Sequence, residues 1–125
     1  MPAWKTEDLN RIADAEEIAV TATNEDGSLR DPVTVWVVRD GHDLYVRSFK
    51  GRGGAWYRSV SERPEGRVGA DGVQKDVTFT VVDDEALNDT VDAAYRSKYQ
   101  RFGAGYLDPM TSDQARGTTR RLDPR

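Results

Sequence analysis

Near the middle of the chain stands the segment Arg47-Ser48-Phe49-Lys50-Gly51-Arg52-Gly53-Gly54-Ala55-Trp56-Tyr57-Arg58. It follows an apolar, strand-like run and precedes residues with helical spacing, so we expect a basic, glycine-rich turn that opens a helix. Glycine lets a backbone approach a ligand closely, and the first amides of a helix have no intrahelical partner. The segment therefore predicts a corner that binds an anion such as phosphate. Its donors would be a hydroxyl, three cations and the amides freed by three glycines: Ser48, Arg47, Lys50, Arg52, Gly51, Gly53 and Gly54.

Two other interpretations of this segment remain open. In one, the glycines only satisfy the geometry of a surface connection, the cations keep it hydrated, and Trp56 and Tyr57 pack into the core. In the other, the basic residues, interleaved with Phe49 and these two aromatics, stack on and neutralise a single-stranded nucleic acid. The net charge of -4 counts against nucleic acid as a partner.

Outward from this segment, short runs of alternating apolar and polar residues predict strands joined by tight turns. The clearest is 73–81. The run 33–38 is apolar on both faces, which suggests that one face meets the core and the other a helix or a second subunit. The predicted strands are 18–23, 33–38, 44–48, 67–70, 73–81 and 118–122.

Helical spacing, capping residues and first-turn acids predict the helices. They are 6–15 with Thr6 as its cap, 55–63, and 83–102 opened by Asp83-Asp84-Glu85 and ended by Gly103, with one more turn at 111–116. Because these helices are appended to the strands rather than alternating with them, we expect a mainly β, α+β fold. No repeat or linker divides the sequence, so we expect a single domain over residues 1–125.

Composition narrows the classes of function. The chain has no cysteine and one histidine, His42 in a polar turn, so we expect neither a thiolate centre nor a histidine-based metal site. No serine stands in a nucleophile-elbow sequence, and we assign no catalytic residue. The sequence has no apolar run of bilayer length and no start typical of a secretory signal, which favours a cytoplasmic protein.

Three runs together resemble the flavin-binding split-barrel proteins: Asp31-Pro32-Val33-Thr34-Val35-Trp36, Leu44-Tyr45-Val46-Arg47-Ser48, and the segment from Lys50 to Arg58. Within that superfamily, the sequence is most similar to a small uncharacterised bacterial family. That family is allied to the deazaflavin-dependent nitroreductases and, more distantly, to the pyridoxamine phosphate oxidases. The similarity runs from about Leu9 through Leu122, and Ala93-Ala94-Tyr95-Arg96-Ser97-Lys98-Tyr99 resembles the long helix of that small family.

This resemblance implies a six-stranded antiparallel split β-barrel that works as a homodimer, with its cofactor at the subunit interface and a small molecule as substrate. It implies that the cofactor's phosphate lies at the basic turn. Our own hypothesis is that its ring lies against Trp36 and the apolar strand faces. Lys98, on the apolar stripe of the predicted long helix, is a further candidate. The predicted cofactor-binding residues are Arg47, Ser48, Lys50, Gly51, Arg52, Gly53, Gly54, Ala55, Trp56, Tyr57, Trp36 and Lys98.

The choice of cofactor depends on one departure from the deazaflavin relatives. These usually carry a further basic stretch for the cofactor's tail, where this chain has Asn24-Glu25-Asp26-Gly27-Ser28. The difference favours FMN and hence an FMN-dependent oxidoreductase, since a flavin carries hydride transfer itself. Three alternatives remain: a deazaflavin-dependent reductase, a non-catalytic module that binds or senses flavin, deazaflavin or haem, and the single-stranded nucleic-acid binder.

Overall fold

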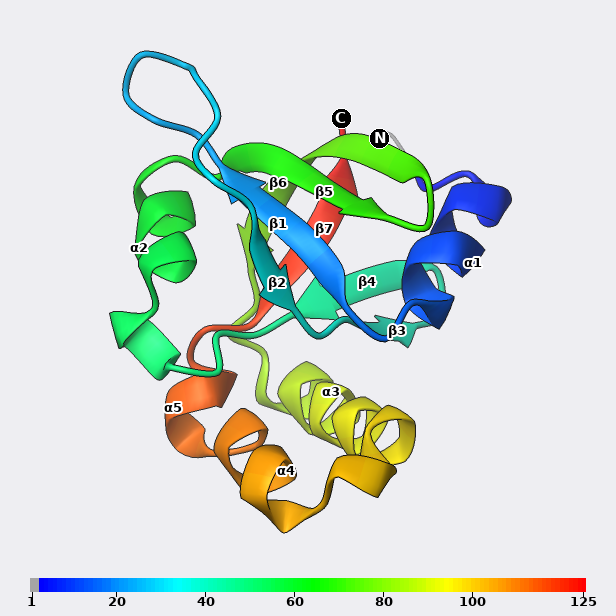
Figure 1. Cartoon of the computed structure of the whole chain (residues 1–125). Helices are drawn as coiled ribbons and strands as arrows, with labels where there is room; N and C mark the ends of the chain where they lie inside the picture. Colours follow the sequence, from blue (N-terminus) through cyan, green and yellow to red (C-terminus); the bar gives the residue numbers. More distant parts are fainter. Residues whose placement is uncertain (1–2) are drawn as a thin grey trace.

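One antiparallel sheet with helices around it makes up the chain (Figure 1). The computed structural model describes residues 3–125. Its strands are β1 (Ile18–Ala22), β2 (Val33–Val35), β3 (Val38–Asp40), β4 (Asp43–Val46), β5 (Glu65–Ala70), β6 (Val73–Val81) and β7 (Arg120–Pro124). Its α-helices are α1 (Thr6–Asp14), α2 (Ala55–Glu62), α3 (Glu85–Lys98), α4 (Ala104–Met110) and α5 (Asp113–Arg116), with 3-10 turns η1 (Gly51–Gly53) and η2 (Gln100–Phe102).

The sheet curls into a barrel because its two edge strands, β2 and β3, follow one another directly in the chain. The strand order is β2-β1-β5-β6-β7-β4-β3, and every neighbouring pair is antiparallel. β2 and β3 stand at opposite ends of this order, yet only Trp36 and Val37 separate them along the chain. The two edges therefore come together, which confirms the predicted split barrel. The single strand expected over 33–38 is instead two short strands, which makes the sheet seven-stranded rather than six-stranded.

Side chains from the end of α3 hold this break in place. The Val37 amide donates to the Tyr99 hydroxyl at 3.1 Å, and the Val37 carbonyl accepts from the Lys98 ammonium at 2.8 Å. In a continuous strand these backbone groups would be paired in the ladder, and buried backbone groups without partners are rare. The two side chains replace the missing ladder bonds, so the chain can leave β1 and join β4.

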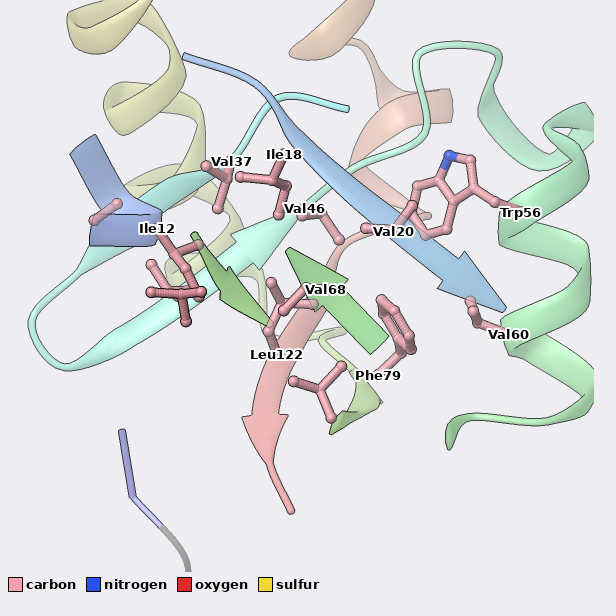
Figure 2. Close-up of a cluster of buried hydrophobic side chains, with 14 of the residues drawn as sticks. Ile12, Ile18, Val20, Val37, Val46, Trp56, Val60, Val68, Phe79 and Leu122 are labelled. Carbon is pink, nitrogen blue, oxygen red and sulfur yellow. The ribbon is translucent and has the colours of Figure 1, made fainter. Parts of the chain in front are cut away.

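A first hydrophobic cluster fills the barrel and extends to α1 and α2 (Figure 2). β1 and β7 bury alternate residues, as strands with one face on a core do. The members labelled in Figure 2 are Ile12, Ile18, Val20, Val37, Val46, Trp56, Val60, Val68, Phe79 and Leu122.

A second cluster joins β3 and β4 to α3 and α4, which lie with α5 on one side of the barrel (Figure 1). β4 is buried on both faces, since Val46 belongs to the first cluster and Tyr45 to the second. None of the helices within residues 3–125 has the length and apolar run needed to cross a bilayer. The buried members of the second cluster are Val38, Tyr45, Val82, Val91, Tyr95, Tyr99, Leu107 and Met110.

Several element ends differ from the sequence-based expectation. Thr6 lies inside α1 and Lys5 is the residue before it, so Thr6 is not the cap. The helix expected to reach residue 102 ends at Lys98, and η2 and α4 follow it. α4 was not predicted, because Gly105 and Pro109 disfavour a helix, yet its Leu107 is buried in the second cluster. The last strand spans Arg120–Pro124 rather than 118–122.

Candidate functional site

A cleft of about 470 Å³ opens where β2, the end of β4, the start of α2 and α4 meet. This volume lies in the range of about 300–1,000 Å³ that small-molecule sites occupy. Most of its wall is apolar, with Glu17, Thr34, Arg47, Ser48 and Lys50 as polar exceptions. The lining residues are Glu17, Val33, Thr34, Val35, Trp36, Arg47, Ser48, Phe49, Lys50, Gly54, Ala55, Trp56, Tyr106 and Met110.

The glycine-rich turn shapes one end of this cleft. Gly51 adopts a positive φ of 63°, and its amide donates to the Ser48 carbonyl at 3.0 Å, which reverses the chain after β4. The Gly54 amide then donates to the Gly51 carbonyl at 3.2 Å, and Gly54 becomes the N-cap of α2. A Cβ atom on Gly54 would lie 2.4 Å from the Ser48 hydroxyl oxygen. Gly54 is therefore required by the close approach of Ser48.

Polar groups without protein partners gather at this end. Within residues 3–125, the amides of Ala55, Trp56 and Tyr57 have no hydrogen-bond acceptor, as expected for the first turn of a helix. Ser48 is 1% exposed as a residue, and its hydroxyl, which faces the cleft, forms no hydrogen bond within the described part of the chain. Lys50 lies beside it on the same cleft. These donors, with the positive pole of α2, make a place suited to an anion.

Arg47 lies at the cleft wall, but its guanidinium points into the protein. Nε donates to the Thr119 hydroxyl at 2.8 Å, and Nη1 donates to Asp92 and to the Met110 carbonyl. Nη2 donates to the backbone and side-chain oxygens of Asn88, both at 3.1 Å. An arginine has five N–H groups, and each one here has a protein acceptor. Arg47 thus ties β4 to α3, α4 and the chain before β7.

Lys98 and Arg52 lie away from this cleft. The Lys98 ammonium donates to the carbonyls of Ala13, Ala15 and Val37 at 2.6–2.8 Å, so its three N–H groups are used. Burial lowers the pKa of Lys98 to about 8, with a smaller opposing effect from the charge of a nearby carboxylate. Arg52 lies instead against Gly117, where a Cβ atom would come within 2.9 Å of its Nη2.

The predicted site residues are therefore only partly brought together. Trp36, Arg47, Ser48, Lys50, Gly54, Ala55 and Trp56 line the cleft, whereas Gly51, Arg52, Gly53, Tyr57 and Lys98 do not. Gly51 and Gly53 still shape the turn. Whether any of these residues binds a cofactor stays a prediction.

Trp36 forms a wall between the barrel and the helices. Its ring stacks on Tyr99 with centroids 4.0 Å apart and planes 3° from parallel. Phe102 and Tyr106 lie near its other sides, at 5.1 Å and 6.1 Å between ring centroids. The packing fixes the orientation of the indole, so the cleft presents a preformed aromatic surface.

Sequence reasoning missed several lining residues, chiefly Glu17, Tyr106 and Met110. Tyr106 and Met110 lie on α4, the helix that the sequence pattern did not reveal. Glu17 precedes β1 in a charged stretch that resembles any exposed connection. No local signal marks it, because its place on the cleft depends on where β2 and α4 lie.

Comparison with solved structures supports this architecture. The heme storage protein HutZ from Vibrio cholerae matches with a TM-score of 0.69 and 14% identity, covering 100% of this chain and 92% of that one. A candidate pyridoxamine 5′-phosphate oxidase from Listeria innocua matches with a TM-score of 0.67 and 13% identity, covering 95% and 91%. A FAD-binding protein from Mesorhizobium loti matches with a TM-score of 0.55 and 13% identity, covering 98% and 89%. These likenesses establish the fold.

At the level of sequence, no curated protein matches the chain. A family model does, over residues 8–122, which covers the whole span over which the sequence resembles a small bacterial family. The chain belongs to the family described as uncharacterised proteins conserved in bacteria, DUF2255.

Proposed function

We propose that this protein binds FMN and acts as an FMN-dependent oxidoreductase on a small acceptor. The observation that carries the proposal is the Ser48 hydroxyl, which faces the cleft at the start of α2 and forms no hydrogen bond among residues 3–125. A hydroxyl that lines a cleft without a protein partner needs a hydrogen-bond partner from solvent or from a ligand. The FMN phosphate would supply it, together with the Lys50 ammonium and the amides of Ala55 and Trp56.

The rest of the cleft suits the flavin ring. Val33, Val35 and Met110 offer apolar contacts, and Trp36 offers an aromatic one. The flavin supplies the hydride-transfer chemistry when bound, so the protein's part is to bind, orient and shield it. Arg47 contributes as a positioning residue, since it holds Met110 and the end of β4 in place.

The proposed assembly is a cytoplasmic homodimer with the cofactor at the subunit interface. Val33, Phe49 and Tyr106 line the cleft and are 38%, 52% and 53% exposed. Large apolar side chains that gather on a surface mark contact sites. A second copy laid over them would cover the open side of the cleft.

Titration of the cofactor-free protein with FMN tests the site. We expect quenching of FMN fluorescence and a rise in melting temperature. Ser48→Ala and Lys50→Ala should each weaken binding about tenfold, the effect of losing one charge-assisted hydrogen bond. Arg58→Ala is the matched control, because Arg58 is exposed on the same helix and does not line the cleft. The site is wrong if both variants bind as the wild type does, and the cofactor is wrong if the wild type does not bind FMN.

The same titration with deazaflavin and with haem separates the alternatives, since the tightest ligand identifies the cofactor. Oxidation of a reduced nicotinamide by the loaded protein then separates an enzyme from a binding or sensing module. Loaded protein that never turns over would support the module. A salt-dependent shift of labelled single strands would support the nucleic-acid binder.

A further inference from the structure

A second cleft, of about 460 Å³, lies between α2, the start of β7 and the chain that follows β6. It is separate from the proposed FMN cleft, with which it shares no lining residue. Charged and polar side chains dominate its wall. They are Arg52, Tyr57, Asp83, Glu85, Arg116 and Arg120.

Arg120 is the feature of this cleft that needs an explanation. The residue is 5% exposed, yet within residues 3–125 no carboxylate forms an ion pair with it. Its Nη1 donates to the Thr119 carbonyl at 3.0 Å, and Nη2 lies 3.3 Å from the Ser61 hydroxyl. The guanidinium also lies 4.8 Å from the centre of the Tyr57 ring and close to its hydroxyl, whose pKa it lowers, so its partners among the described residues are all uncharged. A buried charge without a counter-charge is costly, which points to an anion from outside the chain.

Arg52 adds a second cation without a carboxylate partner to the same wall. No carboxylate forms an ion pair with its guanidinium within the described residues, although the guanidinium lies close enough to the Tyr57 hydroxyl to lower its pKa. It lies against Gly117, whose missing side chain leaves the room it occupies. Arg116, by contrast, is already paired with Asp89 and Asp92.

The lowered pKa of the Tyr57 hydroxyl is consistent with these positively charged surroundings. Burial raises the pKa of its hydroxyl, but hydrogen bonding and charge from Arg120, with smaller contributions from Ser61 and Arg52, lower it overall. Asp83 and Glu85 also line the cleft, and neither forms an ion pair with an arginine among residues 3–125. Their charges would oppose an anion without neutralising Arg120.

We propose that this cleft is a second ligand site, which takes the phosphate group of a small phosphate monoester on Arg120 and Arg52. Two guanidinium groups match the double charge of a phosphate monoester, and their planar forks match its oxygens. The cleft has room for a small organic group attached to the phosphate. The site does not depend on FMN and would hold a substrate or effector beside it.

Nuclear magnetic resonance of the full ¹⁵N-labelled chain with inorganic phosphate as the probe tests this site. We expect saturable shifts of the Gly117 amide and of the Arg52 and Arg120 Nε–H signals, and no comparable shifts with chloride at equal ionic strength. The amides of Ser48 and Ala55 report the FMN cleft independently. Failure of one site can therefore be told from failure of the other.

Three variants and one control variant sharpen the test. Arg52→Ala should weaken phosphate binding about tenfold or more. Gly117→Ala should weaken it too, because the new Cβ displaces the flexible end of Arg52 without changing the charge, whereas Gly105→Ala, which has open space around it, should not. Asp83→Asn should strengthen binding by removing a repulsion. None of these variants replaces the buried Arg120, so the test does not require an Arg120 variant to fold.

The proposal is overturned by any of three results. Phosphate and chloride could give equal shifts, or the shifts could be confined to Ser48 and Ala55. Asp83→Asn could also lower the melting temperature and leave phosphate affinity unchanged, which would identify Asp83 as the counter-charge of Arg120.

Discussion

Arg47 and Arg120 are both buried arginines, but their surroundings differ. Arg47 pairs with Asp92 and has an acceptor for every N–H group. Among residues 3–125, Arg120 donates to one carbonyl and one hydroxyl and lies over the Tyr57 ring, but no carboxylate pairs with it. A buried charge is tolerated when it is paired and fully hydrogen-bonded. The charge of Arg47 is balanced within the protein, whereas for Arg120 we infer an anion from outside the chain.

Replacing Arg47 by lysine tests whether it serves the fold. Lysine keeps the charge but has three N–H groups in place of five, so Arg47→Lys loses at least two of the five hydrogen bonds that Arg47 donates. We expect the free energy of unfolding, measured with urea, to fall by about 2–3 kcal/mol. Arg58→Lys, at an exposed position on α2, should change it by less than about 0.5 kcal/mol. A stable Arg47→Lys variant that binds FMN poorly would instead make Arg47 a ligand-binding residue.

At the level of single residues, the sequence of segment 47–58 predicted the basic turn, and Ser48 and Lys50 do line one cleft. Its local pattern cannot separate them from Arg47, whose acceptors Asn88 and Thr119 are 41 and 72 residues away in sequence. The direction in which a long side chain points depends on such distant partners. Residues of one type in one turn can therefore face different surroundings.

Among the elements, the turn from β4 to α2 follows its sequence closely. Glycines predicted it, and two of them have separate tasks: Gly51 supplies a positive φ, and Gly54 makes room for Ser48. The break between β2 and β3 could not be predicted, because it depends on Tyr99 and Lys98 from α3. Local sequence at 33–38 is apolar on both faces, as in a continuous buried strand, and tertiary contacts override it.

Alanine substitution distinguishes Gly54, where a Cβ has no room, from Gly53, where it has. In Gly54→Ala the added Cβ would meet the Ser48 hydroxyl oxygen at 2.4 Å, so either Ser48 or α2 must move. We expect a loss of about 1–3 kcal/mol in the free energy of unfolding and weaker FMN binding. Gly53→Ala is the matched control, since a Cβ there meets nothing within 4 Å. Equal stability and equal FMN affinity for the two variants would show that the approach of Ser48 to Gly54 does not matter.

For the whole molecule, alternation and turn residues were enough to predict an antiparallel barrel with peripheral helices. They could not place α4 over the end of β2, because its packing depends on Leu107 and Met110 meeting a cluster built from β3, β4 and α3. The part of the cleft wall that α4 supplies, Tyr106 and Met110, is therefore a product of tertiary structure. The exposed apolar side chains around it are the part of the fold that a second subunit would complete.

The proposed homodimer can be tested through two exposed aromatic residues at the cleft. Phe49 and Tyr106 lie with their ring centroids 6.2 Å apart and are both more than half exposed at the cleft. Buried aromatic residues dominate many interfaces, so Phe49→Asp combined with Tyr106→Asp should weaken a dimer by about 2 kcal/mol or more, roughly 30-fold in its dissociation constant. Sedimentation equilibrium measures this change. Leu29→Asp, at an exposed apolar position in the loop between β1 and β2, should leave it unchanged.

FMN affinity connects this assembly to the site. If the partner covers the cofactor, the double variant should lose FMN affinity together with dimerisation, and raising the protein concentration should restore both, because mass action couples them. A wild type that sediments as a monomer at all concentrations would contradict the proposed homodimer. A double variant that is monomeric yet binds FMN as the wild type does would place the cofactor wholly within one subunit.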